Sequence, residues 1–195
     1  GHVDPRAKGY AWDVAQLTLV QRVCVVGNSG SGKSTFSRAL AHKLGYPHLE
    51  LDGIAHQASW RMIDPGEFRA RVGAFIDANP TWIIEGGYEL VRELVWSHTQ
   101  QMIWLDPSRF DNMRAVVCRT VGRSITREVL WNGNRELWSN LYSLDPDKSV
   151  IAWAWVKHPE RRALYTHTID DPRWKHLTWT RFTRRKEAAR WLDAI

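Results

Sequence analysis

Eight consecutive residues near the start of the chain have the types and spacing of a phosphate-binding loop. Residues 27–34 read Gly-Asn-Ser-Gly-Ser-Gly-Lys-Ser and match the pattern G-x-x-x-x-G-K-[ST] at every fixed position. The glycines let successive backbone N–H groups point inward at a phosphate chain. We expect Lys33 to reach the β- and γ-phosphates and the Ser34 hydroxyl to bind Mg²⁺. The expected nucleotide-binding residues are Gly27, Asn28, Ser29, Gly30, Ser31, Gly32, Lys33, Ser34 and Thr35.

The segments on either side of this loop are those that such a loop requires. Residues 22–26 form a short apolar run that is typical of a buried parallel strand. Residues 36–44 have helical periodicity and end before Gly45, which suits a C-terminal cap. A strand, a glycine loop and a helix in this order bring the positive end of the helix dipole to the phosphate. The alternative, a glycine-rich turn that binds nothing, is disfavoured by these flanks.

Acidic residues at the ends of later strands are candidates to complete the site. In a parallel α/β sheet, ligands bind beyond the carboxyl ends of the strands. Asp52 follows the second expected strand and Glu85 ends the third, so either could hold Mg²⁺, directly or through water, or orient an acceptor hydroxyl. The alternatives are a turn aspartate and a buried, paired glutamate. We expect Glu50 to point away from this edge and Asp106 to cap the helix that begins at Pro107.

Arginines are concentrated in one stretch of the chain. Residues 107–135 contain six arginines, no lysine and two acids. The planar fork of arginine suits bidentate contact with phosphate, whereas a surface for duplex nucleic acid would normally carry lysines as well. Arg119, Arg123 and Arg127 share one face of the expected helix, which favours a bound polyphosphate over a solvated face that two acids would neutralise. The polar loop at 131–136 that follows has the character of a lid.

Arg123 provides a first test of this interpretation. We expect Arg123→Ala to lower kcat far more than it weakens ATP binding, because the guanidinium would stabilise charge that develops in the transition state. Steady-state kinetics and an ATP titration measure the two quantities separately. Equal losses in both would argue against a role in the transition state.

Length and composition indicate one globular domain. The chain has 195 residues, of which 44% are hydrophobic and 25% charged, enough for a substantial core. Residues 1–20 are expected to form an N-terminal extension and 21–195 the domain. No apolar run is long enough to span a bilayer, no secretory signal is visible, and Cys24 and Cys118 are expected to be buried thiols, which together favour the cytoplasm. The net charge of +6 leaves nucleic acid open as a partner, although the clustered arginines do not favour it.

Strand-like and helix-like segments alternate, which predicts an α/β fold with helices on both faces of a parallel sheet. The expected strands are 22–26, 47–51, 82–85, 101–105 and 176–181. The expected helices are 34–44, 65–79, 88–96, 107–130, 147–169 and 184–194. Asp64 is expected to cap the helix at 65–79, and Pro159 to kink or restart the helix at 147–169. Tryptophans on these elements are expected in the core, whereas Trp60 and Trp131 lie in loop-like segments where stacking on a base remains open.

Several motifs together resemble one known group of proteins. They are the loop at 27–35, Leu-Asp-Gly at 51–53, Trp-Ile-Ile-Glu-Gly-Gly-Tyr at 82–88, Trp-Leu-Asp-Pro at 104–107, residues 127–136 and Arg-Trp-Leu at 190–192. Over residues 22–194 the chain resembles the adenylate-kinase-related P-loop proteins often labelled DNA topology modulation proteins, within the nucleoside-monophosphate-kinase-like P-loop NTPases. The resemblance implies a five-stranded parallel sheet in the order 2-3-1-4-5 and an arginine-rich lid at about 116–144. It also implies that Arg119, Arg123 and Arg127 are lid arginines and that Arg184 lines an adenine pocket.

These observations favour a phosphotransferase that uses Mg·ATP. Its acceptor would lie between Asp52, residues 85–87 and the arginine lid. By resemblance the acceptor would be a nucleoside monophosphate, and otherwise another small hydroxyl metabolite. A nucleotide-dependent regulator or nucleic-acid-associated ATPase is the main alternative, and it would bind DNA with an affinity that falls steeply with salt. A P-loop toxin that phosphorylates a macromolecule or metabolite is a third.

Overall fold

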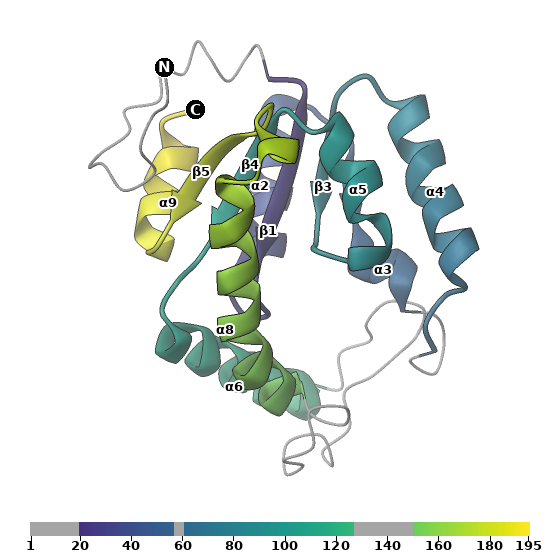
Figure 1. The fold of residues 1–195 in the computed structure, drawn as a ribbon. Coiled ribbons are helices and arrows are strands. Elements are labelled where there is room, and N and C mark those ends of the chain that lie inside the picture. Colours follow the sequence, from purple (N-terminus) through teal and green to yellow (C-terminus); the bar gives the residue numbers. More distant parts are fainter. Residues whose placement is uncertain (1–19, 57–60, 127–149) are drawn as a thin grey trace.

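The five expected strands form one parallel sheet. The computed structural model describes residues 20–56, 61–126 and 150–195, and within them the strand order is β2-β3-β1-β4-β5 (Figure 1). This is the order that the family resemblance implied. The strands are β1 (Arg22–Gly27), β2 (His48–Glu50), β3 (Trp82–Glu85), β4 (Gln101–Leu105) and β5 (Thr178–Phe182).

The helices connect these strands as expected, with two short additions. The longer helices are α2 (Lys33–Leu44), α4 (Pro65–Ala78), α5 (Glu89–His98), α6 (Arg109–Thr126), α8 (Val150–Ile169) and α9 (Arg185–Asp193). The short helix α3 (Leu51–Ala55) and the 3-10 helix η3 (Pro172–Trp174) were not predicted. Helix α8 does not restart at Pro159, which lies inside it.

Alternate residues of the central strand face two separate layers. Val23 and Val25 pack toward α2 and α9, whereas Cys24 and Val26 pack toward α3, α4, α5 and α8. Each of these four side chains is fully buried, as expected when helices cover both faces of a parallel sheet. Consequently an odd or even position along a strand decides which layer of helices a side chain meets.

Local signals explain where several elements begin and end. The Asp64 carboxylate accepts a hydrogen bond from the backbone N–H of Glu67 at 3.0 Å, which confirms the expected cap of α4. At α6 the expectation was wrong, because the cap there is Ser108, whose hydroxyl accepts from the Asp111 N–H at 3.1 Å. Asp106 is instead turned into the protein.

The expectation of buried tryptophans and cysteines holds only in part. Trp82, Trp96 and Trp104 are buried, but Trp155 on α8 is 50% exposed. Both cysteines are free thiols, and Cys118 is exposed rather than buried. None of the helices within the described residues is long and apolar enough to cross a membrane.

Candidate functional site

The predicted phosphate-binding loop has a backbone conformation that suits the binding of an anion. Gly30 and Gly32 adopt φ values of +78° and +95°, which residues other than glycine rarely adopt. A Cβ at Gly30 would also lie 2.6 Å from a methyl group of Val116 on α6. Helix α2 begins immediately afterwards at Lys33, and no side chain caps its first turn. Its N-terminal N–H groups are therefore oriented for a phosphate.

Three cationic side chains meet the carbonyl groups of this loop. The Lys33 ammonium donates to the carbonyl of Asn28 at 3.3 Å, and the Arg161 guanidinium to that of Gly27 at 3.4 Å. Arg185 donates to the carbonyl of Gly30. Arg161 comes from α8 and Arg185 from α9, so both approach from elements more than a hundred residues away in sequence. The loop thus lies at the centre of a positive field that suits a polyphosphate.

Sequence reasoning missed Arg161 and Arg185. Arg184, the residue expected to line an adenine pocket, is the exposed N-terminal cap residue of α9 and adjoins Arg185. Arg119 and Arg123 lie in α6, whose N-terminal part contacts the loop through Val116. The positions of their side chains are not among the described parts of the structure. Trp60, Arg127, Trp131 and the predicted lid beyond residue 126 also lie outside the described residues.

Two glutamates flank the hydroxyl that was predicted to bind Mg²⁺. The Ser34 hydroxyl oxygen lies 2.5 Å from Glu85 Oε1 and 3.2 Å from Glu50 Oε1. Glu85 is only 2% exposed. The expectation for Glu50 was wrong, because Glu50 and Glu85 are paired in register at the ends of β2 and β3. Paired residues of parallel strands face the same side of the sheet, here the side of α2 that carries Ser34.

This group of oxygens fits a magnesium ion. A hydroxyl and carboxylates are the hard oxygen ligands that Mg²⁺ prefers, and they lie at the end of a phosphate loop. Glu85 Oε2 is buried without a hydrogen-bond partner among the described residues, although His48 Nε2 approaches it to 3.3 Å. No group of three acidic, histidine or cysteine side chains suitable for a metal occurs in the described ranges. Phosphate and water oxygens would therefore supply the remaining ligands, as is usual for Mg²⁺.

Asp52 belongs to a second polar group, with Tyr88 and His56. Because residues 51–55 form a helical turn, the Asp52 carboxylate turns toward α5 and accepts a 2.5 Å hydrogen bond from the Tyr88 hydroxyl. His56 Nε2 lies 3.3 Å from the same hydroxyl. Burial, and then the negative charge of Asp52, raise the pKa of Tyr88. The phenol is therefore a neutral hydrogen-bond donor that orients the Asp52 carboxylate.

The backbone between these two groups is tightly enclosed. Gly86 has φ +126° and a Cβ there would lie 3.0 Å from Leu51. A Cβ at Gly87 would lie 2.5 Å from the hydroxyl oxygen of Tyr165 on α8. The two glycines thus let the backbone after β3 pass close to both α3 and α8.

Asp106, the residue directly after β4, pairs with two arginines. Its carboxylate is 6% exposed and accepts hydrogen bonds from Arg181 on β5. Arg162 Nε on α8 lies 3.3 Å from Asp106 Oδ2, the oxygen that also accepts from Arg181. Arg181 also lies over the Trp104 ring at 4.2 Å. Asp106 therefore fastens α8 to the sheet one residue away from Arg161, which reaches the phosphate loop.

We expect Asp106→Ala to lower the free energy of unfolding by about 2–4 kcal/mol, because Arg181 would lose its partner in a largely buried setting. Urea denaturation followed by circular dichroism measures this change. Asp77→Ala is the matched control, since Asp77 is exposed on α4, and a change within about 0.5 kcal/mol is expected there. Similar losses in both variants would mean that the buried pairs contribute little.

Known proteins similar to this chain are kinases. Shikimate kinase of Gloeobacter violaceus is 32% identical over 126 residues, which cover 58% of this chain and 69% of that protein. Shikimate kinase of Synechococcus elongatus is 28% identical over 133 residues, covering 57% and 70%. The structure of shikimate kinase from Acinetobacter baumannii in complex with shikimate superposes with a TM-score of 0.53 at 16% identity, over 92% of this chain and 93% of that one, a likeness of fold. No family model matches the chain.

Proposed function

We propose an acceptor for this protein on the premise that the chain belongs to the family of P-loop kinases that includes the shikimate kinases. It is an ATP-dependent phosphotransferase that acts on a small acceptor and uses ATP with Mg²⁺. The acceptor we propose is a small hydroxylated carboxylic acid, with shikimate as the first compound to test. Membership of the group labelled DNA topology modulation proteins, and a nucleoside monophosphate as acceptor, stay predictions from the sequence.

The observation that carries this proposal is a positively charged hollow beside Gly87. A space of about 410 Å³ lies between α5 and α8, and its lining includes Gly87, Arg92, Lys157, Arg161 and Tyr165. Three of the lining residues are cations and two, Glu89 and Glu160, are acids, and Lys157 pairs with Glu160 at 2.6 Å. The lining keeps a net positive charge, and Arg161 also reaches the Gly27 carbonyl of the phosphate loop. A carboxylate held by these cations would keep a hydroxyl of the same molecule near the phosphate loop.

The residues around the loop can be given roles in the transfer. The acceptor hydroxyl oxygen would attack the γ-phosphorus as its bond to the β,γ-bridging oxygen breaks, so that ADP leaves. Asp52 would take the hydroxyl proton, with Tyr88 holding the carboxylate in place. Lys33 and Arg161 would stabilise the negative charge on the phosphoryl oxygens. Mg²⁺, when bound by Ser34, Glu50 and Glu85 together with phosphate oxygens, would neutralise charge on the nucleotide.

An acceptor screen tests this proposal. ADP production would be followed with MgATP and one candidate at a time: shikimate, other hydroxylated acids, neutral polyols, and nucleoside monophosphates. We expect turnover to rise sharply with a hydroxylated acid and to stay at the background of the Lys33→Ala variant with the neutral polyols. Turnover with a nucleoside monophosphate alone would replace the proposed acceptor by the one that the sequence predicted. Turnover that responds to DNA and to no small acceptor would favour the nucleic-acid-associated ATPase.

A further inference from the structure

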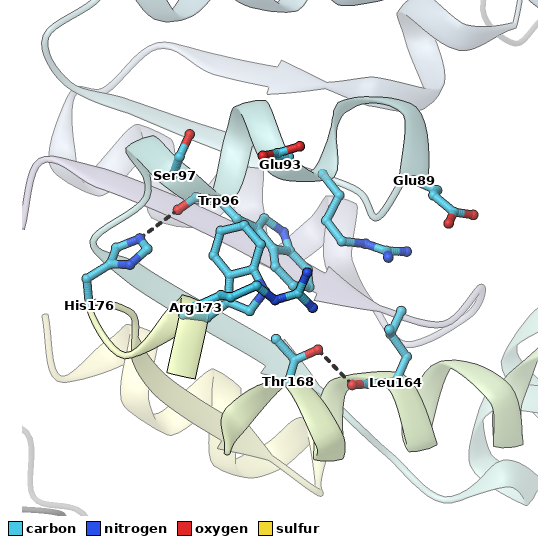
Figure 2. Close-up of a pocket in the computed structure, with 10 residues that line it drawn as sticks. Glu89, Glu93, Trp96, Ser97, Leu164, Thr168, Arg173 and His176 are labelled. Atoms are coloured by element: carbon cyan, nitrogen blue, oxygen red, sulfur yellow. Dashed lines mark hydrogen bonds between the residues drawn. The ribbon is translucent and has the colours of Figure 1, made fainter. Parts of the chain in front are cut away.

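A second hollow, larger than the first, lies on the outer side of α5 and α8. It has a volume of about 680 Å³, within the range of small-molecule sites. Figure 2 shows Glu89, Glu93 and Ser97 of α5 on one side, Leu164 and Thr168 of α8 on the other, and Arg173 between them. None of the residues that we predict to bind the nucleotide lines it. The proposed kinase reaction leaves this space unexplained.

The inner wall of this hollow is aromatic and firmly held. The Trp96 ring is 2% exposed and makes an edge-to-face contact with Trp174, with 5.3 Å between the ring centres. Trp179 also makes an edge-to-face contact with Trp96, with 6.2 Å between the ring centres. His176 Nε2 lies 3.0 Å from the Trp96 carbonyl oxygen and joins the segment after η3 to α5. The half-buried Trp174 therefore supplies the accessible apolar surface of this wall, and the contact with the buried Trp96 fixes its position before a ligand arrives.

The charges point to an anionic ligand with an apolar body. Arg92 extends over the Trp96 ring, with 5.5 Å between its guanidinium carbon and the ring centre. It forms no ion pair with Glu89 or Glu93, although both lie on the same helix, nor with any other acid among the described residues. Arg173, the second guanidinium, is held by Asp171, whose carboxylate accepts from it at 2.7 Å. A half-buried arginine above an indole, without an acid, is suited to a carboxylate joined to a planar group.

The two glutamates narrow the ligand class further. Glu89 and Glu93 are exposed at the rim of the hollow, so they would repel a phosphate dianion more than a single carboxylate. We propose that the hollow bordered by Arg92, Trp96, Arg173 and Trp174 is a binding site for an aromatic monocarboxylate. This site contains no residue of the phosphate loop. It shares Glu89, Arg92 and Leu164 with the proposed acceptor hollow, and Trp96, Arg173 and Trp174 distinguish it from that hollow.

Calorimetric titration with 3-phenylpropionate tests the proposal directly. We expect a dissociation constant on the order of 1 mM for this small ligand. The matched compounds 3-phenylpropanol, which lacks the charge, and acetate, which lacks the ring, should bind at least about tenfold more weakly. Arg92→Gln should weaken binding of 3-phenylpropionate by about tenfold or more, and Arg173→Gln by less. Arg69→Gln, at an exposed position on α4, should leave the affinity for 3-phenylpropionate unchanged.

Indole N–H signals in NMR spectra locate the bound probe. The signals of Trp96 and Trp174, assigned with Trp96→Phe and Trp174→Phe variants, should shift on titration, while that of Trp191 on the opposite face of the sheet should not. Absence of binding, equal binding of 3-phenylpropanol, or an unchanged affinity in Arg92→Gln would each overturn the proposal. So would shifts confined to tryptophans outside the hollow. Failure of the acceptor screen would leave these results unaffected, because binding is measured without ATP.

Discussion

Replacing Lys33 by alanine is expected to lower kcat by about a thousandfold or more, with little loss of stability. The Lys33 ammonium lies 3.3 Å from the Asn28 carbonyl, at the mouth of the loop whose N–H groups would hold the triphosphate. Removing it would take away a charge that we predict to lie beside the γ-phosphate as negative charge moves during transfer. ADP production at saturating MgATP and acceptor measures the effect.

Two controls separate chemistry from folding in this experiment. Lys186→Ala removes an exposed lysine on α9 and should leave kcat unchanged. Thermal unfolding of Lys33→Ala should stay close to that of the wild type, since Lys33 lies at the first position of α2 and is not a core residue. A folded Lys33→Ala variant with wild-type turnover would contradict the assignment of the loop as the phosphate site.

The features that were predicted correctly from the sequence are those decided by local chemistry. The loop, the strand before it and the helix after it are adjacent in the chain, so the spacing of Gly27, Gly30 and Gly32 carried the information. The strand order came from the resemblance and not from periodicity. The cap at Asp64 likewise depends on a residue only three positions away.

The features that were missed depend on contacts between distant elements. Asp106 was read as a cap because a proline follows it, yet two arginines from β5 and α8 draw the carboxylate inward. Glu50 was misjudged because its direction follows from the register with Glu85, which a single sequence does not reveal. Arg161 reaches Gly27 only because α8 folds back across the sheet. A helix of mixed charge near position 161 gave no signal that one of its arginines faces the loop.

Asp52→Asn is expected to lower kcat by about 10²–10⁴-fold while leaving the affinity for ATP nearly unchanged. The carboxylate accepts its hydrogen bond from Tyr88, whereas Ser34 contacts Glu85 and Glu50, so the contacts of Asp52 differ from those of the groups that fit Mg²⁺. Asparagine keeps the size of the side chain and can still accept the hydrogen bond from the Tyr88 hydroxyl. It cannot accept a proton from the acceptor at neutral pH. Single-turnover phosphoryl transfer and ATP titration measure the two effects separately.

Tyr88→Phe tests whether the orientation of Asp52 matters as well as its charge. The phenol donates a 2.5 Å hydrogen bond to Asp52, while its ring packs edge-to-face on Phe68. The variant keeps the ring contact and loses only the hydroxyl, so kcat should fall by about tenfold, less than in Asp52→Asn. In a combined variant, Tyr88→Phe should add little to the loss from Asp52→Asn, because the hydroxyl acts through the carboxylate. Additive losses would show that Tyr88 contacts the acceptor independently, and wild-type turnover of Asp52→Asn would assign the proton transfer to another group.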